Sequence, residues 1–247
     1  MGCTFPNESD EHRLARLRLL DEEIALRRAM ESVAAARRAL PSGGEVPEDY
    51  RFDGLDRAEQ TIKLRLSELF ADNTDTLIVY HFMFPRHVSD ARPQPATGSL
   101  KGLPKTEGPC PSCTALLDQL DRAIPHLEAA GVNFAAVAKA PLDRAVAFAR
   151  DRGWDHLRML SAAGNTFKRD YGGENADGQQ MPILSVFQRG SDGRIRHFWS
   201  SELLFAPTDP GQDPRHVGTI EPLWNLLDFT PAGRPNWDEQ LEYACCH

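Results

Sequence analysis

Continuous apolar runs mark the centre of the chain. They extend from Thr76 to Phe84 and from Val132 to Ala138. Apolarity without alternation is typical of strands that are covered on both faces of a sheet. A shorter strand is predicted from Leu157 to Leu160. The pattern therefore predicts a sheet with at least part of its surface enclosed by helices.

Alternating apolar and polar residues predict two β-hairpins. The first pairs Tyr50 to Gly54 with Ile62 to Leu66, and the second pairs Pro182 to Gln188 with Ile195 to Ser200. The link Gly190-Ser-Asp-Gly193 favours a tight turn in the second hairpin.

Helical spacing of apolar residues predicts several helices. They are expected at Ser9 to Leu40, Thr114 to Ala130, Pro141 to Arg152, Asn165 to Tyr171 and Ile220 to Leu227. From the first buried strand onward, the predicted order is β-α-β-α-β-β-α. The fold class is α/β.

The long N-terminal helix suggests an extension rather than a second core. We expect an amphipathic extension over residues 1–44, one domain over residues 45–231 and a C-terminal tail over residues 232–247. The apolar stripe of the helix is compatible with packing on the domain surface and equally with a homodimer contact.

Composition narrows the functional classes. The chain has 247 residues and a formal net charge of −8, and no basic face or Lys/Arg tract suggests nucleic-acid binding. No apolar run approaches the roughly 20 residues that span a bilayer, and the first residues lack a signal-peptide pattern. We therefore expect a cytoplasmic protein with no membrane or nucleic-acid partner.

The strongest chemical signal is Cys110-Pro-Ser-Cys113, which lies directly before the predicted helix from Thr114. Cys110 is expected at the N-cap with Pro111 at the first helical position, where a missing N–H has no cost. Free amide groups and the helix dipole favour a thiolate there, so Cys110 is the predicted nucleophile. Cys113 lies one turn deeper and is the predicted resolving thiol.

Two other interpretations of the cysteine pair remain open. It could be half of a structural zinc site, although the chain contains no second C-x-x-C. It could also be two ordinary core cysteines. A C-x-x-C beside a βαβ pattern favours a redox dithiol, which is our leading interpretation.

A loop rich in Pro and Gly, from Pro85 to Pro109, leads into this motif. Loops of this length are typically functional lids or flexible segments. We expect either a lid over the dithiol or simple disorder.

Seven short segments resemble the DUF899 family, whose bacterial members are described as thioredoxin-like dithiol-disulfide oxidoreductases. They are Tyr80–Phe84, Cys110–Cys113, Ala123–His126, Val137–Pro141, Ser161–Gly164, Leu184–Phe187 and Leu226–Pro231. The resemblance implies a thioredoxin-like mixed sheet with helices on both faces and the Cys pair at the head of the first core helix. The loop from Pro85 to Pro109 looks like an insertion relative to the family.

The resemblance also implies a cis-proline opposite the Cys pair. Pro182 occupies the matching position, and with Met181 and Pro111 it is expected to shape a substrate groove. The alternative is that Pro182 only begins a strand. A thiol or disulfide substrate and an electron donor are the implied partners, with no cofactor.

Histidines offer a proton carrier or a metal ligand. His81 lies on the strand that leads to the Cys pair and could move a proton to the resolving thiol, or it could be a core histidine. Tyr80 is the adjacent candidate if the register differs by one residue. The alternative function is copper or zinc binding by Cys110 and Cys113 with His81 or His197, because thiolate and imidazole suit these metals.

The chain ends in Cys245-Cys246-His247, which could exchange electrons or soft metals with the dithiol, or be a disordered tail.

Overall fold

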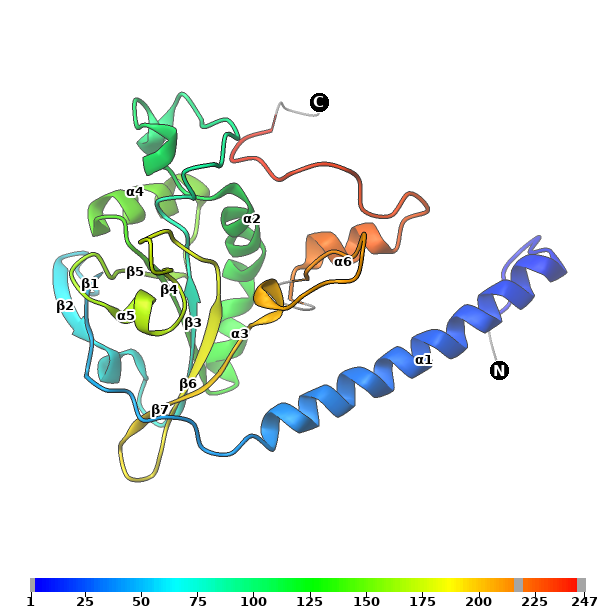
Figure 1. The fold of residues 1–247 in the computed structure, drawn as a ribbon, viewed down its shortest axis with the longest axis horizontal. Helices are drawn as coiled ribbons and strands as arrows, with labels where there is room; N and C mark the ends of the chain where they lie inside the picture. Colours follow the sequence, from blue (N-terminus) through cyan, green and yellow to red (C-terminus); the bar gives the residue numbers. More distant parts are fainter. Residues whose placement is uncertain (1–2, 216–219, 244–247) are drawn as a thin grey trace. The chain divides into compact units, whose positions relative to one another are not determined.

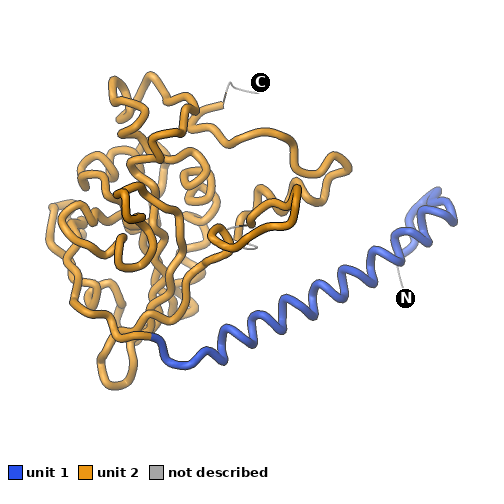
Figure 2. The backbone as a smooth tube through the Cα atoms, in the orientation of Figure 1, with its two compact units in different colours: residues 1–43 blue, residues 44–247 orange. Residues whose placement is uncertain are grey.

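The computed structural model describes residues 3–215 and 220–243 and divides into two compact units, residues 1–43 and residues 44–247 (Figure 2). The first unit contains helix α1 (Asp10–Arg38), which agrees with the helix predicted from Ser9 to Leu40. Ser9 is its N-cap, and the hydroxyl oxygen accepts a hydrogen bond from the amide of His12 at 3.2 Å. None of the residues of α1 is buried.

The second unit is built on a seven-stranded sheet with the order β2-β1-β5-β4-β3-β6-β7 (Figure 1). The strands are β1 (Arg51–Leu55), β2 (Thr61–Arg65), β3 (Thr76–His81), β4 (Val132–Ala138), β5 (Arg158–Ser161), β6 (Leu184–Arg189) and β7 (Ile195–Ser200). Strands β3, β4 and β5 are parallel to one another. Both predicted hairpins form, as antiparallel pairs at the two edges of the sheet.

Helices lie on both faces of this sheet. The α-helices of the unit are α2 (Pro111–Leu120), α3 (Ile124–Ala129), α4 (Leu142–Arg152), α5 (Phe167–Asp170) and α6 (Pro222–Asp228). Short 3₁₀ segments are η1 (Leu66–Leu69), η2 (Gly98–Leu100), η3 (Lys105–Glu107), η4 (Asp121–Ala123) and η5 (Leu203–Phe205). The mixed sheet, its helices and the Cys pair at the head of α2 confirm the thioredoxin-like fold.

Alternation along β3 separates two hydrophobic cores. Tyr80 belongs to the core that α2, α3 and α4 cover, together with both cysteines. Leu77 and Val79 belong to the opposite core, which Phe167 of α5 fills. Because successive side chains of a strand point to opposite faces, each position on β3 is committed to one core or the other.

Several predicted elements are shorter than expected, and two of them lie next to the cysteine motif. β3 ends at His81 rather than Phe84. The helix predicted from Thr114 to Ala130 is divided into α2 and α3 by η4, because Pro125 cannot continue a helical hydrogen-bond ladder. The buried carboxylate of Asp121 at this break accepts from the amides of His156 and Leu157, at 3.0 and 2.9 Å.

Residues 232–243, expected as part of a tail, belong to the second compact unit. The side chains of Glu239 and Leu241 are buried there. Within the described ranges, no helix has both the length and the apolarity needed to cross a membrane.

Candidate active site

The cysteine motif begins where the chain returns from β3 to the first helix of the core. The amide of Cys110 donates to the carbonyl of Met83 at 2.9 Å, which fixes the start of α2 beside the end of β3. Cys110 is the N-cap residue with extended dihedrals, and Pro111 is the first residue of the helix. The local sequence therefore forms the predicted helix start.

Both thiols are free and buried, and the pair is electrostatically asymmetric. A hydrogen bond from Cys113 lowers the pKa of Cys110 to about 7, with the amide of Cys113 and the charge of Arg92 contributing in the same direction. Burial raises the pKa of Cys113 well above its ordinary value, and the neighbouring Cys110 adds to that rise. Cys110 is thus the thiolate of the pair at neutral pH.

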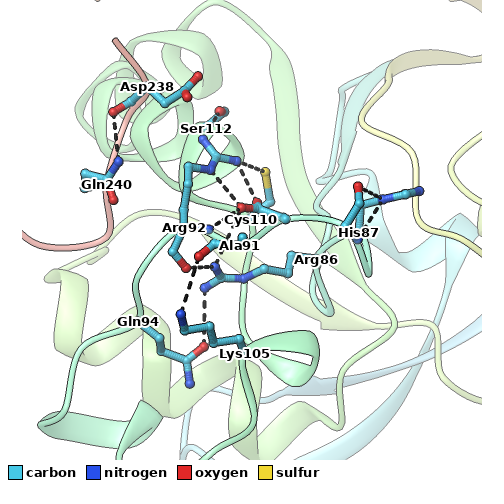
Figure 3. Close-up of polar contacts among 12 residues, drawn as sticks. Arg86, His87, Ala91, Arg92, Gln94, Lys105, Cys110, Ser112, Asp238 and Gln240 are labelled. Atoms are coloured by element: carbon cyan, nitrogen blue, oxygen red, sulfur yellow. Dashed lines mark hydrogen bonds and ion pairs between the residues drawn. The ribbon is translucent and has the colours of Figure 1, made fainter.

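Arg92, in the loop between β3 and α2, reaches the sulfur of Cys110 (Figure 3). Its Nη2 donates to Cys110 Sγ at 3.6 Å, and its Nη1 donates to the hydroxyl of Ser112 at 2.8 Å. Asp90 orients the guanidinium by accepting from Nε at 2.9 Å and from Nη2 at 2.7 Å. The loop therefore places a fixed positive group on the thiol.

The base of this loop is closed by contacts between its two ends. The amide of Arg86 donates to the carbonyl of Gly108 at 2.8 Å. The buried guanidinium of Arg86 donates to the carbonyl of Arg92 at 3.0 Å and to Gln94 Oε1 at 3.3 Å. A Cβ at Gly108 would lie 1.9 Å from Gln94 Oε1, so a larger residue there would displace the Gln94 side chain. The described loop is thus an ordered cover over the dithiol.

A C-terminal segment covers the site from another direction. Glu239 Oε2 accepts from Ser112 Oγ at 2.8 Å, and Glu239 Oε1 accepts from the indole of Trp224 at 2.7 Å. Nη1 of Arg92 also donates to the main-chain carbonyl of Glu239 at 3.3 Å. Between these covers the Cys110 residue is only 6% exposed. Access to the sulfur therefore requires one cover to move.

Tyr80 rather than His81 faces the dithiol. Tyr80 belongs to the core that holds both cysteines, and burial followed by the charge of the Cys113 thiol raises the pKa of Tyr80 well above its ordinary value. His81 lies on the opposite face, where its ring stacks on Phe167 at a centroid distance of 5.3 Å and Nε2 lies 3.3 Å from Ser185 Oγ. The predicted proton-carrying role for His81 is wrong, because strand alternation directs its side chain into the other core.

The structure tests one feature of the expected substrate groove, the cis bond before Pro182. The Met181–Pro182 bond is trans, since the single cis bond of the described residues joins Phe84 and Pro85. The cis-Pro182 prediction is therefore wrong, and the bond has the intrinsically favoured isomer. Met181 lines a separate cavity of about 940 Å³ with Tyr171 and His197, and the cysteines do not border it. Pro111 lies within the motif and begins α2 directly after Cys110.

The proposed metal ligands are also divided between the two faces. His197 hydrogen-bonds through Nε2 to Ser200 Oγ at 2.7 Å and packs against Phe187, in the core that holds His81. The donor set of two cysteines with either histidine therefore does not fit one metal ion. Across the described ranges, no three or more His, Cys, Asp or Glu side chains form a metal-binding group. The predicted Cys245-Cys246-His247 site lies outside these ranges.

Sequence reasoning did not identify Arg92, Glu239 or Lys168. Arg92 lies in a Pro-rich loop and Glu239 in the expected tail, and both reach the site through contacts between residues far apart in sequence. Lys168 lies in an ordinary charged helix sequence, yet its side chain is completely buried. The only local signal for any of these residues was the loop rich in Pro and Gly directly before the motif, which contains Arg92.

A family model described as "Bacterial protein of unknown function (DUF899)" matches residues 3–245. No curated protein matches the sequence significantly. Solved structures with a similar backbone include peroxidoxin BcpB from Mycobacterium tuberculosis, with 15% identity over 74% of this chain and 95% of that one, at a TM-score of 0.42. AhpC from Enterococcus faecalis has 12% identity over 75% and 93% of the two chains, at a TM-score of 0.44. At these TM-scores the likeness is loose, and the fold assignment rests on the strand order and connections described above.

Proposed function

We propose that this chain, which belongs to the DUF899 family, is a thiol-disulfide oxidoreductase that uses Cys110 as nucleophile and Cys113 as resolving thiol. The observation that carries the proposal is the opposite displacement of the two pKa values at a helix N-terminus. A low-pKa thiol beside a high-pKa thiol can attack first and be resolved second. The substrate class is an oxidised sulfur compound.

The reaction divides into two balanced steps. The Cys110 thiolate attacks one sulfur of a disulfide, forming a mixed disulfide and releasing the other sulfur as a thiolate. Cys113 then attacks Cys110 Sγ, the Cys110–Cys113 bond forms, and the second substrate sulfur leaves. The protein is oxidised by two electrons and the substrate is reduced by two. An external thiol donor must return the pair to the dithiol form.

Arg92 has a direct part in the first step. Its guanidinium stabilises the thiolate before attack and remains hydrogen-bonded to Asp90 and Ser112. A charge-assisted hydrogen bond to the sulfur also limits the directions from which a substrate can approach. The enclosure of Cys110 by the loop and by Glu239 favours a small substrate or one that displaces a cover.

The experiment is a trapping assay with a chromogenic aromatic disulfide as the probe. The assay uses a protein that carries C3S, C245S and C246S, so that only the motif cysteines react. With both motif cysteines it is expected to release two equivalents of aromatic thiol and to end with a Cys110–Cys113 bond. Adding Cys113→Ser is expected to leave one equivalent released and a stable mixed disulfide on Cys110. Restoring the exposed Cys3 is the matched control and should add one equivalent without changing the outcome at the motif. Release of aromatic thiol by Cys110→Ser as fast as by Cys113→Ser would contradict the proposal.

A further inference from the structure

A cavity of about 940 Å³ lies apart from the dithiol, in a part of the protein that the redox mechanism does not use. Cavities that hold small molecules typically measure about 300–1,000 Å³. Four parts of the chain build the wall: the segment before β1, the end of α5 with the turn after it, the segment before β6, and β7 with the residues that follow it. Tyr171 and His197 of this wall pack on Phe187, which belongs to the core opposite the cysteines. The cavity is therefore a second candidate site, on the other side of the sheet.

Aromatic and aliphatic side chains form the apolar part of the wall. Tyr171 and Phe205 contribute rings, and Met181 and Ile183 contribute flexible and branched chains. The ring of Tyr171 is held edge-on against Phe187 at a centroid distance of 4.8 Å. Phe205 is 49% exposed, so its ring is available for contact. A ligand with an apolar body fits such a wall, because contact removes apolar surface of both partners from water.

A hydrogen-bonded pair of polar side chains stands in the same wall. His197 Nε2 and Ser200 Oγ lie 2.7 Å apart. The hydroxyl of Ser200 hydrogen-bonds with that of Ser185 at 2.8 Å, and Ser185 Oγ lies 3.3 Å from His81 Nε2. This chain of hydrogen bonds fixes the orientation of the pair, as is typical of polar groups that orient a ligand. Burial lowers the pKa of His197, so the pair carries no positive charge at neutral pH.

The charged side chains of the wall are all carboxylates, namely Glu45, Asp170, Glu174 and Glu202. Two of them have cationic partners. Glu45 pairs with Arg194 at 2.9 Å. Glu174 pairs with Lys139 at 3.2 Å and with Arg169 at 2.8 Å. The charges of these two carboxylates are therefore compensated within the protein.

The other two carboxylates are not compensated in this way. Asp170 accepts hydrogen bonds from the hydroxyl groups of Tyr50, at 2.7 Å, and Thr166, at 2.5 Å. Among the described residues, no lysine or arginine forms an ion pair with Asp170 or Glu202. The wall thus combines aromatic rings with two negative charges that the surrounding side chains leave unpaired.

We propose that this cavity binds a small organic cation, in which an ammonium group is attached to an apolar body. The apolar wall contacts the body, and the carboxylates of Asp170 and Glu202 attract the ammonium group. The rings of Tyr171 and Phe205 add the attraction between a cation and an aromatic face. A ligand that carries a carboxylate is repelled by the same charges. The cysteines take no part in this site, so the inference is independent of the redox function.

The test compares three indole compounds of similar size and different charge. Tryptamine is a cation, tryptophol is its neutral alcohol analogue, and indole-3-propionate is an anion. Binding is followed by NMR of carbon-13-labelled methionine methyl groups, of which the chain has five. Met181 lies in the wall, and Met83, whose carbonyl accepts from the amide of Cys110 at 2.9 Å, reports on the dithiol. The Met181 signal is identified by its absence in Met181→Leu.

Tryptamine is expected to shift the Met181 signal and to leave the Met83 signal unchanged. Half-saturation should need about tenfold less tryptamine than tryptophol, because a hydrogen bond between charged groups is stronger than one to a neutral group. Indole-3-propionate should give no shift at the same concentrations. An unmoved Met181 signal with tryptamine would overturn the proposal, as would equal half-saturation concentrations for tryptamine and tryptophol.

Glu202→Gln tests the charge with little change of shape. It is expected to raise the half-saturation concentration of tryptamine about three- to fivefold at low ionic strength and to leave that of tryptophol unchanged. Glu128→Gln is the matched control, because Glu128 is exposed on α3 and does not line the cavity. Equal effects of the two substitutions on tryptamine would contradict recognition of the ammonium group by the wall.

Ala206→Trp tests the place of binding. Ala206 is an exposed residue of the wall, so a large ring there can occupy the cavity without removing a buried contact. It should abolish the tryptamine shift, whereas Ala58→Trp, in the exposed turn between β1 and β2, should retain it. A retained shift in Ala206→Trp would refute the site. Cys110→Ser should bind tryptamine as the wild type does, so failure of the redox proposal leaves this result unaffected, and loss of binding in that variant would place the ligand at the dithiol instead.

Discussion

Replacement of Arg92 by Met should raise the pKa of Cys110 from about 7 to about 8. The guanidinium donates to the sulfur at 3.6 Å, a separation at which two unit charges interact by about 4.6 kcal/mol at an effective dielectric constant of 20. Asp90 compensates much of that charge through a two-point hydrogen bond. The hydrogen bond from Cys113 and its amide remain in the variant. We therefore expect a loss of about 1.4 kcal/mol, or about one pKa unit.

The pKa itself is a better readout of this change than the reaction rate. At neutral pH the thiolate fraction would fall from about one half to about one tenth. A more basic thiolate is intrinsically more nucleophilic, by about threefold for each unit of pKa. The two effects leave a net rate change of only about twofold. The assay is therefore the pH dependence of thiolate absorbance, in a protein that lacks Cys3, Cys245 and Cys246.

Arg144→Met is the matched control for this experiment. Arg144 on α4 pairs with Glu107 of the same loop at 2.9 Å, so the control removes a loop contact without touching the sulfur. It is expected to leave the pKa of Cys110 near 7. An unchanged or lower pKa in Arg92→Met would refute the assigned role of the guanidinium. A rise in both variants would assign the effect to loop position instead.

Three further predictions concern the cover and the opposite core. Ser112→Ala and Glu239→Gln each weaken the hydrogen bond between Ser112 and Glu239 that holds the C-terminal segment over the site. Alkylation of Cys110 above its pKa should therefore accelerate up to about tenfold. Unchanged rates would show that this hydrogen bond does not limit access to Cys110. Gly173→Ala should lower the free energy of unfolding by about 1–3 kcal/mol in urea titrations, because the new Cβ would lie 2.2 Å from His81 Nδ1. Gly164→Ala, with open space around its Cβ position, should not. Burial holds the pKa of His81 well below its ordinary value, so the unfolded chain takes up a proton at a higher pH than the folded protein does. The free energy of unfolding should therefore fall as pH drops below about 6.5, by up to about 1.4 kcal/mol per pH unit. Replacing His81 by Asn should reduce the dependence of stability on pH and leave the pKa of Cys110 unchanged. A changed pKa of Cys110 would contradict the placement of His81 in the core opposite the dithiol.

The sequence predicted those parts of the fold that local patterns determine. The apolar run of β4 and the turn at Gly190 to Gly193 each produced the expected element. Cys110 and Pro111 formed the expected helix start for the same reason, because capping depends on neighbouring residues.

Residues that act through the tertiary structure were less predictable. Choosing between Tyr80 and His81 required knowing which core each side of β3 faces, and adjacent positions on a strand always face opposite ways. Arg92 and Glu239 meet at Ser112 from distant segments. Lys168 shows no sign in the local sequence that its ammonium is buried beneath β3.

The central claim is that the Cys110 and Cys113 thiols exchange two electrons as a pair. The most direct test equilibrates the full chain with mixtures of reduced and oxidised dithiothreitol, quenches with an alkylating reagent and maps the peptides by mass spectrometry. Our account predicts a reversible transition in which the two residues change together, with the loss of two hydrogen atoms on oxidation and a Cys110–Cys113 bond. Independent alkylation of the two thiols under every condition, with no bond between them, would contradict it.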